Sequence, residues 1–157
     1  TRIAFAAILA LCWQAAAQPP KRPVEEFATG AGTVKITIIR HASLLIEAPG
    51  QTVYVDPAQG DYTGLPQAGM ILLTDTHGDH FVPALIDKLK KAGTTIVAPP
   101  AAAEKLPGAV VMKNGDTRTI GPWRIEALPM YNLKRGPSPG TVFHEKGRML
   151  QVVKHSN

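Results

Sequence analysis

The chain has 157 residues, of which 45% are hydrophobic and 18% are charged, and its formal net charge at pH 7 is +5. This composition is too apolar for a disordered protein and is sufficient for one domain with a hydrophobic core. The positive charge does not indicate a nucleic-acid partner. The only tight basic run, from Lys88 to Lys91, is typical of the solvent-facing side of a helix.

Residues 1–17 have the parts of a secretory signal peptide. Arg2 precedes the apolar stretch from Ile3 to Leu11, and three alanines that end at Ala17 offer a small-residue cleavage site. The stretch is too short to be a stable membrane anchor, so we expect an exported protein, periplasmic or secreted. An apolar first helix of the fold is the alternative interpretation. The single cysteine, Cys12, lies in this segment, so the mature chain would have no disulfide and no cysteine-based zinc site.

Residues 18–32 are rich in proline and glycine and predict a linker, with a folded domain over residues 33–157. In that domain, apolar Val34, Ile36 and Ile38 alternate with polar residues, which predicts a half-buried strand. The other expected elements are strands over 44–47, 52–55, 70–73, 95–98 and 109–112, a helix from Pro83 to about Ala92, a short helix over 101–106, a hairpin over 117–128 and a loop over 132–146. Early strands followed by strand–helix alternation indicate a layered α/β or α+β fold.

Four potential metal ligands fall within six residues directly after the strand expected over 70–73: Asp75, His77, Asp79 and His80. A tight loop can aim all four side chains inward, and Gly78 permits a sharp backbone turn. Imidazole and carboxylate groups together suit Zn²⁺, Mn²⁺ or Fe²⁺. At an open coordination position, bound water ionises near neutral pH and becomes a hydroxide nucleophile. The alternative is a polar loop whose aspartates cap the helix that follows.

The cluster resembles the His-x-His-x-Asp-His signature of the metallo-β-lactamase superfamily. Residues 36–43 (ITIIRHAS) and 53–57 (VYVDP) resemble the opening strands of one branch of that superfamily. The branch contains L-ascorbate-6-phosphate lactonase-like hydrolases and N-acyl-phosphatidylethanolamine phospholipase D. Residues 129–132 and 143–147 resemble a group of uncharacterised hydrolases in the branch. The resemblance covers roughly residues 33–148 and implies the amino-terminal half of the four-layer αβ/βα metallo-β-lactamase sandwich.

The resemblance also implies a role for each residue of the cluster. Asp75 and His77 match the ligands of the first metal site, and Asp79 and His80 match those of the second. Asp79 is further implied to orient the attacking hydroxide, which makes it the candidate catalytic residue. His144 is the candidate third ligand of the first site.

Three departures from the family pattern bear on function. Asp75 stands where the signature has histidine, and its oxygen ligand would shift metal preference toward Mn²⁺ or Fe²⁺ or weaken the first site. Residues 131–132 (Tyr-Asn) replace the usual histidine of the branch, which is why His144 is considered. The chain ends at Asn157, before the bridging aspartate that the family implies, so we expect a truncated domain.

His41 and Asp56 flank the cluster in this branch. A carboxylate such as Asp56 can fix the tautomer of a ligand histidine, and His41 is a second candidate for such a supporting role. In the alternative interpretation, Asp56-Pro57 caps a turn, and His41 is a polar residue at a strand end.

The sequence therefore predicts a metal-dependent hydrolase with one or two divalent transition metals, of which Zn²⁺ is favoured and Mn²⁺ or Fe²⁺ are alternatives. A metal-bound hydroxide would attack an ester, lactone, amide or phosphodiester bond of a small-molecule substrate. The competing hypothesis is a truncated, inactive remnant that binds metal. True β-lactamase activity fits the export signal but not the branch resemblance. A homo-oligomer is also considered, because half a sandwich exposes an apolar sheet face.

Overall fold

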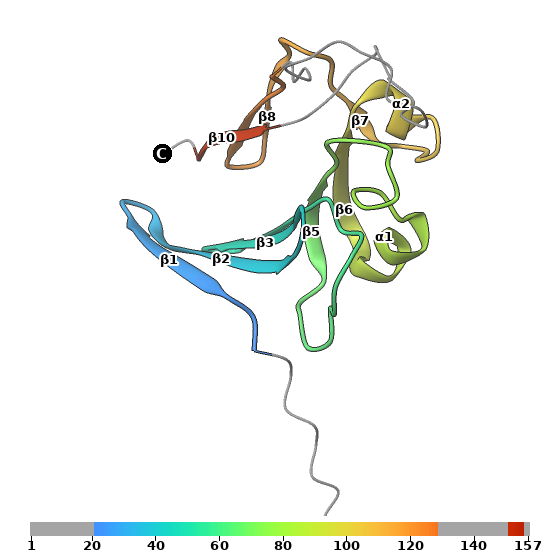
Figure 1. The fold of residues 1–157 in the computed structure, drawn as a ribbon. Coiled ribbons are helices and arrows are strands. Elements are labelled where there is room, and N and C mark those ends of the chain that lie inside the picture. Colours follow the sequence, from blue (N-terminus) through green and yellow to red (C-terminus); the bar gives the residue numbers. More distant parts are fainter. Residues whose placement is uncertain (1–20, 129–150, 156–157) are drawn as a thin grey trace, which may run out of the picture.

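The computed structural model describes residues 21–128 and the backbone of residues 151–155. The larger sheet contains, in spatial order, β1 (Val24–Thr29), β2 (Gly32–Arg40), β3 (Ser43–Ala48), β4 (Gln51–Val55), β5 (Ala68–Leu72), β6 (Lys90–Ala98) and β7 (Val110–Val111). The smaller sheet has β9 (Trp123–Glu126) between β8 (Thr117–Ile120) and β10 (Gln151–His155). The described helices are α1 (Pro83–Leu89) and α2 (Pro100–Ala103), both short (Figure 1).

The larger sheet changes from antiparallel to parallel at β4. Strands β1 to β4 pair antiparallel, whereas β4, β5, β6 and β7 pair parallel. Parallel neighbours need a crossover connection between their ends. The helices α1 and α2 lie in two such connections, from β5 to β6 and from β6 to β7. Because β2 and β4 both run opposite to β3, they run in the same direction as β5. The carboxyl ends of β2, β4 and β5 therefore lie at the same end of the sheet.

The strands β3 to β6 carry buried apolar side chains on both faces of the sheet, because successive side chains along a strand point to opposite faces. Tyr54 and Ile71 point to the helical side, where they share a buried cluster with Ile86 of α1. Val53 and Leu72 point to the opposite side, toward β9 of the smaller sheet. Figure 1 accordingly shows helices on one side of the large sheet and the small sheet on the other. The layered α/β class predicted from the sequence is confirmed.

The predicted linker is wrong over residues 24–29, which form β1 and pair with β2 in a hairpin. This strand is held by backbone hydrogen bonds, and all six of its residues are exposed. No pattern of apolar burial therefore marks it in the sequence. Gly32 closes the hairpin with a φ of 115°, and a Cβ there would lie 2.7 Å from Pro49 Cγ.

The helix expected to reach Ala92 ends earlier, at Leu89, because the chain becomes extended at Lys90 and begins β6 there. Thr94 stabilises this early start, since its hydroxyl accepts the Lys91 N–H at 2.8 Å and donates to the Ala68 carbonyl at 2.6 Å. The second predicted helix is also shorter than expected and ends at Ala103. The predicted hairpin is confirmed as β8 and β9.

Of the helices in the described residues, none is long and apolar enough to cross a membrane. The expected signal segment and the loop predicted over 132–146 lie outside the residues that the structure describes.

The buried centre of β5 gives a test of this fold. Ile71 has no exposed surface, so the Ile71→Ala variant should lower the free energy of unfolding by about 2–5 kcal/mol. Ile38 on β2 is 41% exposed, and Ile38→Ala should lower the free energy of unfolding by less than about 1 kcal/mol. Urea denaturation of both variants measures the difference, and equal losses would contradict the described core.

Candidate metal centre

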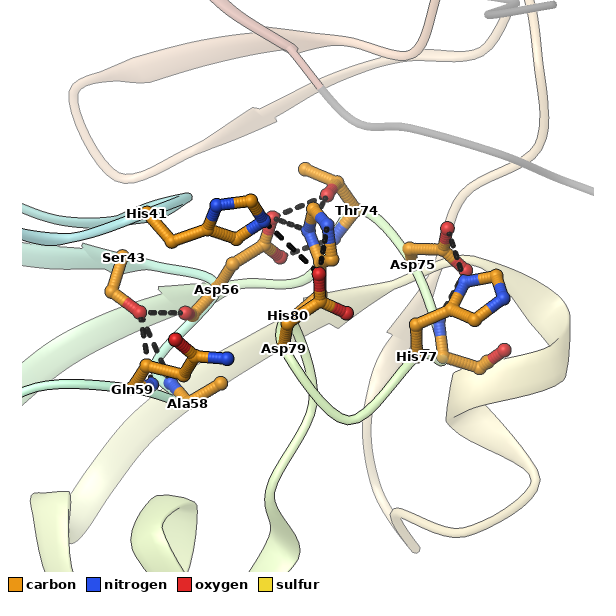
Figure 2. Close-up of polar contacts among 11 residues, drawn as sticks. His41, Ser43, Asp56, Ala58, Gln59, Thr74, Asp75, His77, Asp79 and His80 are labelled. Carbon is orange, nitrogen blue, oxygen red and sulfur yellow. Dashed lines mark hydrogen bonds and ion pairs between the residues drawn. The ribbon is translucent and has the colours of Figure 1, made fainter. Parts of the chain in front are cut away.

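The candidate site forms where three strands of the larger sheet end. His41 lies in the turn from β2 to β3, Asp56 directly follows β4, and residues 74–80 form the loop after β5. Because these strands run in the same direction, their carboxyl ends bring the side chains together (Figure 2). In open α/β sheets this end of the strands is the usual place for a ligand.

The carboxylate of Asp56 is the buried centre of the site and is only 2% exposed. Its Oδ1 accepts the backbone N–H of Thr74 at 2.7 Å, and its Oδ2 accepts the hydroxyl of Thr74 and lies 2.7 Å from His80 Nδ1. An ionised carboxylate can only accept, so the proton of neutral His80 resides on Nδ1 and its Nε2 carries a lone pair. Burial raises the pKa of Asp56, although the hydrogen bonds from Thr74 and His80 act in the opposite direction.

The backbone is in the left-handed region at two residues of the site. Among the described residues, His41 with a φ of 52° and Asp56 with a φ of 43° are the non-glycine positions with positive φ. Such a conformation costs about 1–3 kcal/mol, and strain of this kind concentrates at functional sites. Ser43 supports the second position, because its hydroxyl donates to the Asp56 carbonyl at 2.7 Å. The same hydroxyl accepts the backbone N–H of Ala58 at 3.2 Å.

His41, Asp79 and His80 form the cluster that could hold a metal ion. One ligand atom from each lies within 4.8 Å of the others. His41 Nε2 is 3.0 Å from Asp79 Oδ2, and His80 Nε2 is 3.9 Å from the same oxygen. The side chains of His41 and Asp79 are 55% and 40% exposed, so solvent and small molecules can reach the cluster.

The carboxyl group of Asp79 is held in its ionised form. Partial burial raises its pKa, but its own backbone N–H and the neighbouring His80 and His41 outweigh that effect and leave the pKa below its usual value. A carboxylate that stays ionised can serve as a metal ligand or accept a proton.

Asp75 and His77 form a separate pair beside this cluster (Figure 2). His77 Nδ1 lies 2.8 Å from Asp75 Oδ2, and the other oxygen of Asp75 accepts the Thr76 N–H at 2.6 Å. Burial raises the pKa of Asp75, but these two contacts reverse the effect and lower it overall. The four motif residues thus divide into two pairs, Asp75 with His77 and Asp79 with His80. The second pair forms the candidate metal cluster together with His41.

Most residues of the site can be identified from the sequence, but the sequence gives Thr74 no role and gives His41 a smaller role than the structure shows. The expected contact of Asp56 with a histidine of the cluster is present at His80. Thr74 was not singled out, although a hydroxyl residue between a buried strand and the cluster was a usable signal. His41 was expected beside the site, and the structure places it in direct contact with Asp79. His144 lies outside the described residues.

The family of the chain follows from comparison with known proteins. Residues 35–151 match the sequence model of the β-lactamase superfamily domain. The chain belongs to this superfamily. A crystal structure from Parabacteroides distasonis ATCC 8503, which carries the provisional name of a metal-dependent hydrolase, is 38% identical with a TM-score of 0.68. The match covers 76% of this chain and 55% of that one, so the chain spans about half the length of this relative.

Two more distant structures share the fold. Igni18, described as a metallo hydrolase of Ignicoccus hospitalis KIN4/I, is 17% identical with a TM-score of 0.54, over 74% of this chain and 53% of that one. CmlA, a diiron β-hydroxylase of Streptomyces venezuelae, has the same identity of 17% and TM-score of 0.54, over 87% of this chain and 29% of that one. A search of curated proteins gave no match.

The comparisons confirm the predicted metallo-β-lactamase fold and the membership in the β-lactamase superfamily. The L-ascorbate-6-phosphate lactonase-like branch stays a prediction. The family implies divalent metal binding, and the residues present fit such an ion. The imidazole of His80 and the ionised carboxylate of Asp79 converge, with His41 beside them, at a solvent-accessible strand end, and imidazole and carboxylate are donors that divalent transition metals accept.

The contact between Asp56 and His80 can be tested with Asp56→Asn. Asparagine keeps the side-chain volume and tolerates positive φ, but its amide replaces only part of the carboxylate's hydrogen-bond acceptors, so the free energy of unfolding should fall by about 1–3 kcal/mol. Because His80 loses its charged partner in this variant, the affinity of the protein for Zn²⁺ should fall by about 10–100-fold. Isothermal titration calorimetry measures the change.

Asp61→Asn is the matched control, because Asp61 is an exposed aspartate that accepts a backbone N–H from Thr63 at 2.7 Å in a neighbouring loop. It should bind Zn²⁺ like the parent. Equal affinity in the Asp56→Asn variant would show that the buried carboxylate does not support a metal ligand.

Proposed function

We propose that this chain provides the metal-binding part of an exported hydrolase that cleaves an ester, lactone, amide or phosphodiester bond in a small molecule. The observation that supports the proposal most is the convergence of Asp79 and His80 with His41, since one side-chain nitrogen or oxygen atom of each lies within 4.8 Å of the others. The buried Asp56 behind His80 adds support, because a carboxylate on the far nitrogen is the usual partner of a metal-binding histidine.

In this proposal Asp79 and His80 hold one ion. Asp75 and His77 contribute to a second, with His144 as its candidate third ligand. Zn²⁺ is the favoured metal, and Mn²⁺ or Fe²⁺ are the alternatives because of the carboxylates. A divalent ion at this place supplies Lewis acidity, which polarises the substrate carbonyl or phosphoryl oxygen and acidifies water.

The residues of the chain supply positioning and proton transfer. The ionised carboxylate of Asp79 accepts a hydrogen bond from the attacking water and orients it toward the substrate. His80 presents Nε2 to the site because Asp56 holds its Nδ1–H at 2.7 Å. The exposed fraction of Asp79, 40%, leaves room for a substrate to approach from solvent.

The competing proposal is an inactive remnant that binds metal. One observation favours it: both carboxylate oxygens of Asp75 have other partners, His77 Nδ1 at 2.8 Å and the Thr76 N–H at 2.6 Å, so this proposed ligand is already engaged. The two proposals differ in whether a metal-loaded protein hydrolyses a substrate, and one experiment can test both.

Metal content is the first test. The purified parent should contain about one or two equivalents of a transition metal by elemental analysis, and Asp79→Ala should lose most of it. Asp87→Ala is the matched control, since Asp87 is an exposed aspartate of α1 paired with Lys90 at 2.6 Å, and it should retain the metal. The metal-loaded parent should then hydrolyse a generic ester or phosphodiester at least about 100-fold faster than Asp79→Ala. A metal-loaded parent without any hydrolysis would support the remnant instead.

The aspartate at the first position of the motif gives a second test. Asp75→His restores the nitrogen ligand of the family signature. It should raise the affinity for Zn²⁺ relative to Mn²⁺ by about tenfold or more, because imidazole is a softer ligand than carboxylate. Competition titrations with the two metals measure the ratio, and an unchanged ratio would remove Asp75 from the proposed ligand set.

A further inference from the structure

We propose that His41 is a positioning residue, whose Nε2–H donates to Asp79 and fixes the carboxylate at the metal site. The proposal rests on the proposed function, because it assigns a role within that site. It adds to the site a residue that lies outside the loop motif of residues 75–80, because His41 follows β2 and the motif follows β5.

The geometry around Asp79 favours a hydrogen bond from His41. His41 Nε2 lies 3.0 Å from Asp79 Oδ2, which is a hydrogen-bond distance. His80 Nε2 lies 3.9 Å from the same oxygen, which is too long for a direct hydrogen bond. An aspartate side chain that is 40% exposed would otherwise retain rotamer freedom. Its contact with His41 restricts that freedom through one carboxylate oxygen and leaves the other oxygen outside this hydrogen bond.

The backbone conformation at His41 also favours a role for its side chain. Arg40 and Ser43 are paired across the turn from β2 to β3, so two residues make the connection. The first of them, His41, has a φ of 52°, where glycine would be less strained. A turn that only had to reverse the chain would be served better by glycine. The position therefore indicates that the imidazole side chain is needed.

Asp79 and His80, the two neighbouring residues of the loop, are supported in matching ways. His80 receives Asp56 from the end of β4, and Asp79 receives His41 from the end of β2. The rings of His41 and His80 also meet edge to face, with centroids 5.8 Å apart and planes at 74°. Each of the two adjacent proposed ligands thus has one partner from a separate strand end (Figure 2).

The alternative role for His41 is that of a third metal ligand, and the two roles differ in one proton. A positioning histidine carries a proton on Nε2, whereas a ligand histidine offers a bare Nε2 to the metal. Nitrogen NMR of ¹⁵N-histidine-labelled protein loaded with ¹¹³Cd²⁺ distinguishes them. We expect cadmium coupling at His80 Nε2 and a protonated, uncoupled Nε2 at His41. Cadmium coupling at His41 Nε2 would overturn the proposal.

Two variants separate positioning from a merely structural role. His41→Asn keeps a residue that tolerates positive φ but is too short to reach Asp79. It should keep the parent's thermal stability and lose about 10–100-fold in Cd²⁺ affinity. His41→Gln reaches further with an N–H donor and should recover part of that affinity. Arg40→Gln, at the end of β2 next to this turn, is the control and should bind Cd²⁺ like the parent.

The outcomes are distinguishable from failure of the proposed function. Parent-like affinity in His41→Asn, or no recovery in His41→Gln, would overturn the role of His41 while the metal site remains. A parent that binds Cd²⁺ but hydrolyses nothing would reject the hydrolase and leave the role of His41 intact. A parent that binds neither Cd²⁺ nor Zn²⁺ would overturn both.

Discussion

The hydrogen bonds of the buried Asp56 carboxylate are the interactions on which the site depends. They join the end of β4 to Thr74 and His80 in the loop after β5, with contacts of 2.7 Å to the Thr74 N–H and to His80 Nδ1. A buried carboxylate is tolerated only when its oxygens are hydrogen-bonded, and a partner that is lost leaves an uncompensated charge. The same contacts that make the burial of Asp56 acceptable therefore fix the loop and the direction of the His80 ring.

The strand directions explain how residues so distant in sequence meet. The antiparallel start of the sheet makes β2 run in the same direction as β4, and the parallel pairing then adds β5. Three connections consequently meet at one end of the sheet. The first contributes His41, the second contributes Asp56, and the third contributes Asp79 and His80. Two of these connections have a strained, positive φ at the residue whose side chain enters the site, His41 in one and Asp56 in the other.

The sequence predicted those parts of the structure that leave a local signal. Alternating apolar residues marked the buried strands, and the dense motif after β5 marked the site. The strand β1 left no such signal, because its side chains are exposed and only its backbone is paired. The direct contact of His41 with Asp79 links residues that are 38 positions apart. It depends on the pairing of β2 with β3 and of β3 with β4, which a single sequence does not reveal. The separation of Asp75 and His77 from Asp79 and His80 was equally invisible, since motif spacing does not give the path of the loop.

An anomalous diffraction experiment on crystals soaked in Zn²⁺ tests the central claim most directly, because it locates the ion without reference to catalysis. The account predicts a zinc peak within about 2.0–2.2 Å of His80 Nε2 and an oxygen of Asp79, at the end of β5. Asp56 should lie behind the histidine and outside the coordination sphere. Crystals that take up no zinc, or that hold it away from Asp79 and His80, would contradict the assignment of this strand end as a metal centre.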